Sequence, residues 1–259
     1  MPSIAPPNRS LHHRFRTLWS DRLDPHSYLG LHLTISLAVV ALCVWIFGAV
    51  LDAVLDNDLV VRWDMAIDLA IHQHMTPGDL RLVDGVTQLG SPIAMVLLGV
   101  GVALVLWRNH RTVLWGWVAA FVGGAAIGQL LKMVVHRTRP VYGAAYLHGG
   151  SFSFPSGHAM GSMIGYGMLV YLVRSVYHAR PLRRRVATGV AVLLVLAVGV
   201  SRILLGVHYP TDVVGGWVAG LGWMSVCIAG IGIAQQRRRD RESAHAAAAV
   251  TEAGHSTIR

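Results

Sequence analysis

The stretch VATGVAVLLVLAVGVSRILL, residues 186–205, carries a single charged side chain, Arg202, which lies close to its end. A helix needs about 20 consecutive, mostly apolar residues to cross the hydrocarbon core of a bilayer. This stretch therefore predicts a membrane span. Apolar runs of similar character recur at about 31–51, 92–107, 113–132, 158–174 and 213–234. We expect an all-α fold in which six transmembrane helices form a bundle.

The composition agrees with a membrane protein. Hydrophobic residues make up 54% of the chain and charged residues 14%, whereas a soluble domain carries roughly 25% charged residues. The formal net charge is +9, but the cations lie mainly in loops and tails, as membrane topology requires. A basic stripe interleaved with exposed aromatic residues is missing from the sequence, which argues against binding of nucleic acid.

The segment between the first two spans, residues 52–90, is acidic. Amphipathic helices lying at the membrane surface suit its mixture of apolar and acidic residues, and a plain solvated loop is the alternative. At its end, Ser91 followed by Pro92 predicts a helix start, with the serine as N-cap. The aspartates of the segment are Asp52, Asp56, Asp58, Asp64, Asp68, Asp79 and Asp84.

Charges between the spans predict the topology. Cytoplasmic loops collect Lys and Arg, so the basic segment 1–30 is predicted as a cytoplasmic tail and the acidic segment 52–90 as extracytoplasmic. The six-span domain covers 31–235. The segment 236–259 opens with arginines and is predicted as a second cytoplasmic tail, mostly disordered. This predicts a multi-pass protein of a plasma membrane, of the bacterial inner-membrane kind, with both termini in the cytoplasm.

The predicted external segment 133–157 is basic against this trend, and a bound anion would explain its charge. Lys132 and Arg139 bracket its start. A guanidinium can hold phosphate oxygens with two parallel hydrogen bonds, and an ammonium acts as a point charge. Nothing in the sequence distinguishes His136 and Arg137, between them, from side chains that reach toward lipid headgroups.

Two further stretches carry chemistry. In Pro155–Ser156–Gly157–His158, the serine and glycine open a helix whose free N–H groups favour an anion, and His158 can protonate a leaving oxygen. In the third stretch, Arg202 adds a guanidinium and His208 is the candidate nucleophile. Asp212, four residues on, can fix the tautomer of His208. Helix capping is the alternative role for Asp212.

The predicted topology places all of these residues at one end of the bundle, on the external side. Four span ends carry them: the third and fifth spans end there, and the fourth and sixth begin there. Three cations, two histidines and a carboxylate would then surround one phosphoryl group without a metal or another cofactor.

The three stretches resemble the signature of the type 2 phosphatidic acid phosphatase (PAP2) superfamily, and the resemblance covers about residues 90–235. It implies a helical, metal-independent phosphatase, here of the integral membrane lipid phosphatase branch. It also implies a phosphohistidine at His208, oriented by Asp212, with His158 as general acid. The phosphate-binding residues would be Lys132, Arg139, Ser156, Gly157 and Arg202.

The predicted substrate is a lipid phosphate or diphosphate within the bilayer, of the polyprenyl pyrophosphate or of the phosphatidate and phosphatidylglycerophosphate type. A lipid phosphotransferase with an acceptor other than water is the main alternative. A vanadate-dependent peroxidase and a non-enzymatic transporter fit less well, because peroxide chemistry needs no membrane and the charges cluster at one interface instead of lining a pathway. The sequence leaves the lipid and the oligomeric state open.

Overall fold

The computed structural model describes residues 28–56, 59–142 and 152–256, and these residues form helices and no strands. The segment predicted as an N-terminal tail lies almost wholly outside the described residues. The helices are α2 (Tyr28–Leu55), α3 (Leu59–His72), α4 (Pro77–Thr87), the 3-10 turn η1 (Gln88–Gly90), α5 (Pro92–Leu106), α6 (Arg111–Val135), α7 (Gly157–Tyr171), the π-helical turn η3 (Leu172–Val176), α8 (Pro181–Leu204) and α9 (Pro210–Ser256).

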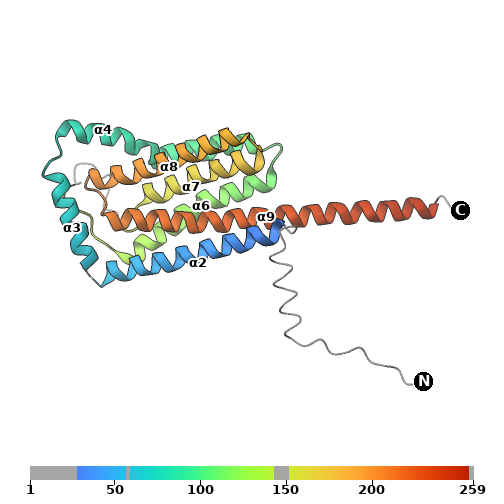
Figure 1. The fold of residues 1–259 in the computed structure, drawn as a ribbon, viewed down its shortest axis with the longest axis horizontal. Coiled ribbons are helices and arrows are strands. Elements are labelled where there is room, and N and C mark those ends of the chain that lie inside the picture. Colours follow the sequence, from blue (N-terminus) through green and yellow to red (C-terminus); the bar gives the residue numbers. More distant parts are fainter. Residues whose placement is uncertain (1–27, 57–58, 143–151, 257–259) are drawn as a thin grey trace, which may run out of the picture.

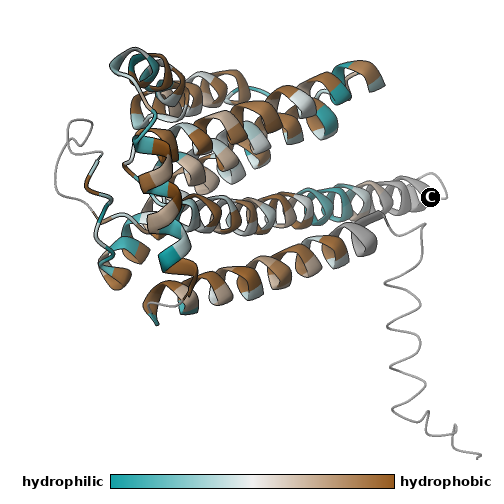
Figure 2. Ribbon diagram, turned by 60° about the vertical axis from the view of Figure 1, so that its left-hand side comes forward, coloured by the Kyte–Doolittle hydropathy of each residue, from teal (hydrophilic) through white to brown (hydrophobic). Residues whose placement is uncertain are grey.

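Six helical segments of the described chain are long and apolar enough to cross a membrane, which confirms the predicted six-span helical fold. Their outer faces are apolar. Trp45 is 71% exposed and Ile93 is 74% exposed, and brown apolar residues cover the outside of the bundle in Figure 2. Lipid tails solvate such faces in a membrane protein.

The helix start predicted at Ser91 is confirmed. Ser91 is the N-cap of α5, its Oγ accepts a hydrogen bond from the Ala94 amide at 3.2 Å, and Pro92 occupies the first turn. A serine oxygen in this position satisfies an amide that the helix itself leaves unpaired. The apolar segment that could span the membrane nevertheless runs from Pro77 to Leu106, through α4 and η1.

The acidic segment forms the helices α3 and α4, as the sequence predicted, and Figure 1 shows them at the end of the bundle where α9 begins. Thr76 caps α4 through a reciprocal capping box with Asp79. Three polar side chains of these helices, Asp64, Asp68 and Thr87, are buried against the bundle. Both helices therefore turn polar side chains toward the bundle as well as toward the outer surface.

Helix α9 packs against α2, α6 and α7 (Figure 1). Gly216 allows its first turns to approach α7 closely. A Cβ atom at Gly216 would lie 2.6 Å from the Ser156 carbonyl oxygen and 3.1 Å from the Ala159 Cβ. The starts of α7 and α9 thus meet backbone to backbone, which brings the second and third sequence stretches together.

The C-terminal segment differs from the sequence prediction, because the expected disorder of 236–259 is replaced by helix as far as Ser256. Alanine is frequent there and has the highest helix propensity. Pairs four residues apart add support, with Gln236 Nε2 donating to Asp240 Oδ1 at 2.9 Å and Arg238 Nε to Glu242 Oε1 at 2.7 Å. In Figure 1 this part of α9 extends beyond the bundle.

Candidate active site

The first stretch lies where α6 ends. Lys132, in the last turn, is 9% exposed. His136 ends the helix in the left-handed conformation, with φ 52°, and its amide donates to the Lys132 carbonyl. The chain then turns back, so that the Arg139 guanidinium donates from Nη1 to the Val207 carbonyl at 2.8 Å and contacts His208 Nε2 at 3.2 Å. Two stretches distant in sequence therefore meet at Arg139.

The second stretch opens α7. Ser156 is its N-cap, with an Oγ that accepts from the Ala159 amide, and is fully buried. The Ser156 amide donates to the Asp212 carbonyl at 2.9 Å, which ties α7 to α9. Gly157 lies beside the ammonium of the first stretch, because a Cβ built on it would be 3.9 Å from Lys132 Nζ. A glycine here leaves the helix N-terminus open to an anion.

The third stretch turns between α8 and α9. Gly206 has φ +65° and follows the end of α8. Its amide donates to the Ile203 carbonyl, and the next amide, of Val207, donates to the Arg202 carbonyl. A glycine is favoured at a helix end in this conformation because it has no Cβ to clash. The turn buries His208, which is 2% exposed, between the two helices.

The hydrogen bonds of His208 define its tautomer. A guanidinium can only donate, so Nε2, facing Arg139, is the acceptor. The proton is then on Nδ1, which donates to Asp212 Oδ2 at 3.3 Å. Asp212 also caps α9, since Oδ2 accepts from the Tyr209 amide at 2.9 Å. The two roles that the sequence left open for Asp212 thus coexist, and the unprotonated nitrogen of His208 faces the cations.

Arg202 is held by a residue that the sequence did not indicate. Its Nη1 donates to Thr87 Oγ1, on α4, at 2.9 Å, and both side chains are buried. Its Nε is buried without a hydrogen-bond partner among the described residues. A buried N–H donor without a partner destabilises the protein unless a ligand or a water molecule accepts a hydrogen bond from it.

The electrostatics indicate that these groups lie within reach of one another. His158 interacts with Arg202, His208, Lys132 and Arg139. Burial lowers the pKa of His208 to about 4, and the nearby Arg139 and Arg202 act in the same direction, while Asp212 acts against them. His208 is therefore neutral near pH 7, which is the state in which an imidazole can attack phosphorus.

Arg137 is the site residue whose role was wrongly predicted from the sequence. Its side chain is 9% exposed and, instead of reaching toward lipid headgroups, bridges two carboxylates: Nη1 lies 2.6 Å from Asp212 Oδ1, and Nη2 lies 2.8 Å from Asp64 Oδ2. The sequence did contain one indication of a role for Arg137, because it is a cation in a segment predicted to be external, where cations are uncommon. Its partner Asp64 lies 73 positions away, a pairing that no local spacing could predict. His136, by contrast, is exposed, as expected.

Comparison with known proteins identifies the family. The sequence pattern of the PAP2 superfamily matches residues 113–235. Phosphatidylglycerophosphatase B of Bacillus subtilis is 30% identical over 180 residues, covering 68% of this chain and 87% of the relative. The chain belongs to the PAP2 superfamily. It is a phosphatase and a multi-pass membrane protein, as the sequence predicted.

Two further comparisons agree. A decaprenylphosphoryl-5-phosphoribose phosphatase of Mycobacterium tuberculosis is 31% identical over 186 residues, covering 70% of this PAP2 chain and 97% of the relative. The crystal structure of a transmembrane PAP2-type phosphatidylglycerolphosphate phosphatase from Bacillus subtilis superposes with a TM-score of 0.64. It is 27% identical and covers 73% of this chain and 93% of that one. The shared fold therefore extends over 73% of this chain.

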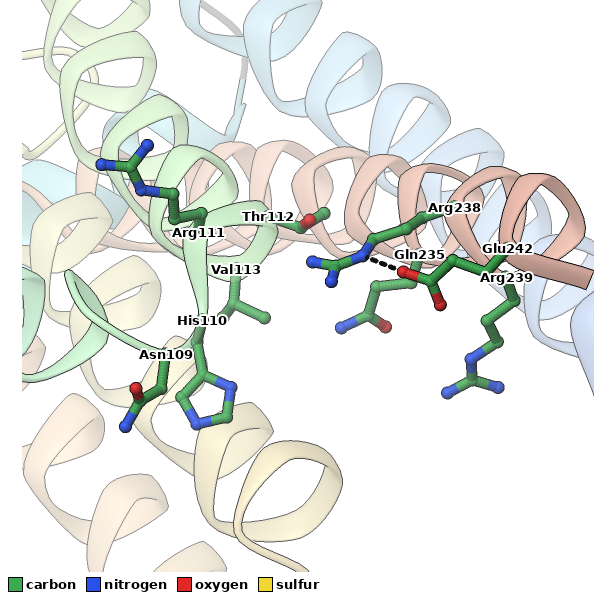
Figure 3. A pocket seen from close by; sticks show the side chains of 9 residues that line it. All are labelled: Asn109, His110, Arg111, Thr112, Val113, Gln235, Arg238, Arg239 and Glu242. Carbon is green, nitrogen blue, oxygen red and sulfur yellow. Dashed lines mark hydrogen bonds and ion pairs between the residues drawn. The ribbon is translucent and has the colours of Figure 1, made fainter. Parts of the chain in front are cut away.

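A surface pocket lies at the other end of α6, remote from these groups. Figure 3 shows it between the α5–α6 connection and α9, with side chains that reach toward open space and an ion pair from Arg238 to Glu242. None of the residues of the three stretches lines it. Among the described residues, no group of three or more His, Cys, Asp or Glu side chains is arranged to hold a metal ion.

Proposed function

We propose that this PAP2 protein hydrolyses a membrane lipid phosphate or diphosphate through a phosphohistidine at His208. One observation carries the proposal: Nε2 of a neutral, buried His208 is turned toward Arg139, while Nδ1 is held by Asp212. A nucleophile oriented by a hydrogen bond on its other nitrogen matches the general pattern of an activated nucleophile. The surrounding cations Lys132, Arg139 and Arg202 would stabilise charge on the transferring group.

The reaction then has two steps. In the first, His208 Nε2 forms a bond to phosphorus, the bond from phosphorus to the leaving oxygen breaks, and His158 gives its proton to that oxygen. In the second, His158 removes a proton from water, the water oxygen bonds to phosphorus, and the phosphorus–nitrogen bond breaks. Inorganic phosphate leaves and both histidines return to their starting states. Ser156 and Gly157 would hold phosphate oxygens at the start of α7.

A lipid is the substrate class best supported. The site lies at the end of a bundle whose outer faces are apolar, and α3 beside it exposes Trp63 and Met65. A phosphate at this end can reach the site while its acyl or prenyl tail stays in the bilayer. The relatives named above are phosphatases of a glycerolipid phosphate and of a decaprenyl compound. Both types therefore belong in the substrate panel.

The test is phosphate release by the purified protein from detergent-solubilised lipid mono- and diphosphates, glycerolipid and polyprenyl. The His208→Ala variant should lose activity, and the exposed His74 offers the matched control His74→Ala, which should keep it. Brief reaction with a labelled phosphate ester followed by quenching in base should retain label on the wild-type protein and on His74→Ala, but not on His208→Ala. Wild-type release by His208→Ala would refute the nucleophile, and phosphate recovered on a second alcohol instead of water would indicate a phosphotransferase.

We also propose that the site faces the extracytoplasmic side, with both termini in the cytoplasm. The support is the even number of candidate spans and the distribution of arginines between them. Fusion of a fluorescent protein or of alkaline phosphatase after residue 259 tests it. Fluorescence without alkaline phosphatase activity is the expected result, and the reverse pattern would contradict this orientation.

A further inference from the structure

Asp64 of α3 lies outside the three sequence stretches, yet it is built into the hydrogen-bond network of the site. It is 2% exposed. Its Oδ1 accepts from the Thr211 amide at 3.2 Å, and its Oδ2 accepts from the Thr211 hydroxyl and from Arg137 Nη2. Thr211 directly precedes Asp212. Asp64 therefore contacts both the arginine that holds Asp212 and the residue beside it.

Arg137 transmits this contact to the catalytic pair. Its Nη1 donates to Asp212 Oδ1 at 2.6 Å and to Thr211 Oγ1 at 2.7 Å, and its guanidinium lies over the Tyr209 ring at 4.4 Å. The attraction of the two carboxylates outweighs the effect of burial and raises the pKa of Arg137. A planar fork that bridges two carboxylates is a geometry that lysine cannot reproduce.

Charge balance explains why two carboxylates are needed. Arg137 alone would neutralise Asp212, which has to stabilise positive charge that develops on His208. Asp64 compensates, since the trio of Asp64, Arg137 and Asp212 sums to one net negative charge. That equals the charge of Asp212 by itself. The guanidinium can thus fix the position of Asp212 without removing its electrostatic effect on the imidazole.

We propose that Asp64 is a positioning residue of the phosphatase, acting through Arg137 to hold Asp212 in place at full effective charge. This inference rests on the proposed role of His208. The acidic helix α3, which precedes the region matched by the family pattern, would then belong to the catalytic apparatus.

The pH dependence of kcat/KM separates this role from simple scaffolding, because its acid limb reports protonation of His208 in the free enzyme. The charged groups facing His208 are His158 on α7, Arg202 on α8, Asp212 on α9 and Arg139 after α6. Asp68, one turn along α3, faces Asp64. All of these stay unchanged in the variants below.

Opposite charge changes in the trio should move the limb in opposite directions. Asp64→Asn leaves the trio neutral, so the limb should move to lower pH, on the order of half a pH unit. Arg137→Gln leaves two negative charges, so the limb should move to higher pH. In each variant kcat should fall on the order of tenfold, the scale found for partners that orient catalytic groups. Asp56→Asn, at an exposed aspartate, is the control and should match the wild type.

The double variant Asp64→Asn with Arg137→Gln restores one net negative charge, that of Asp212, whose carboxylate keeps its hydrogen bonds from His208 Nδ1 and the Tyr209 amide. Its limb should return to the wild-type position, and it remains informative if either single variant fails to fold. A displaced limb in the double variant, shifts of the same sign in both single variants, or a wild-type kcat in Asp64→Asn would each overturn the proposal. Activity in a parallel His208→Ala sample would instead refute the proposed function on which it rests.

Discussion

Replacing Gly216 with alanine should separate the starts of α7 and α9. The added Cβ would lie 2.6 Å from the Ser156 carbonyl oxygen, 3.1 Å from the Ala159 Cβ and 3.2 Å from the Met160 amide nitrogen. Two of these three neighbours are backbone atoms, so a change of side-chain rotamer cannot relieve the contact. The helices must move apart, and the bond from the Ser156 amide to the Asp212 carbonyl must lengthen.

The size of the effect follows from a comparison within one helix. Gly230, also in α9, has nothing within 4 Å of the position that an alanine methyl group would take, so Gly230→Ala only exchanges a poor helix former for a good one. That exchange gains about 0.5–1 kcal/mol. Gly216→Ala gains the same amount but loses about 1–3 kcal/mol to overpacking. The difference between the two variants is therefore about 1–3 kcal/mol.

Thermal unfolding in detergent measures this difference. At about 3 °C per kcal/mol for a chain of this size, Gly216→Ala should unfold about 3–9 °C below Gly230→Ala. Its phosphate release should also fall, because Asp212 and Ser156 are displaced together, while Gly230→Ala keeps wild-type activity. Equal midpoints and equal activity in the two variants would show that the helices are not in backbone contact, and the site geometry described above would then be wrong.

Three further predictions concern the site itself. Thr87→Val should raise KM on the order of tenfold, because the Arg202 guanidinium loses its hydrogen-bond acceptor. Thr87→Ser keeps a hydroxyl and should return KM to the wild-type value. A wild-type KM in Thr87→Val would contradict this prediction. Because burial lowers the pKa of His208 to about 4, protonation of this proposed nucleophile should reduce kcat/KM only as the pH approaches 4. A loss of kcat/KM on the acid side centred near the ordinary histidine pKa of about 6.5 would mean that His208 is solvated. Phosphate release should be unchanged by EDTA, and recovery of a lost activity on adding a divalent cation would refute the metal-independent mechanism.

The fold was largely predictable because each span is a local feature of the sequence. The run from 186 to 205, for example, reads as a span by length and polarity alone. The C-terminal segment was the exception: it has the charged and alanine-rich composition of a tail, but the same alanines favour continuation of α9 beyond the bundle.

The site was predictable only in part. A contact within a short stretch could be predicted, as between His208 and Asp212, four positions apart. Contacts between distant segments could not, because helix packing determines them. Asp64 bonds to Arg137 across 73 positions and Thr87 to Arg202 across 115. Buried polar groups on a surface helix have no periodic signature that distinguishes them from solvated ones.

The group of buried cations at the site affects the stability of the purified protein. Lys132, Arg139 and Arg202 repel one another within a buried region, and this repulsion opposes folding. An oxyanion bound among them offsets it, and any ligand selective for the native state adds stability, about 2.7 kcal/mol at a concentration roughly one hundred times its Kd. Released phosphate would therefore both stabilise the enzyme and compete with its substrate, so phosphate buffers should lengthen shelf life while slowing turnover.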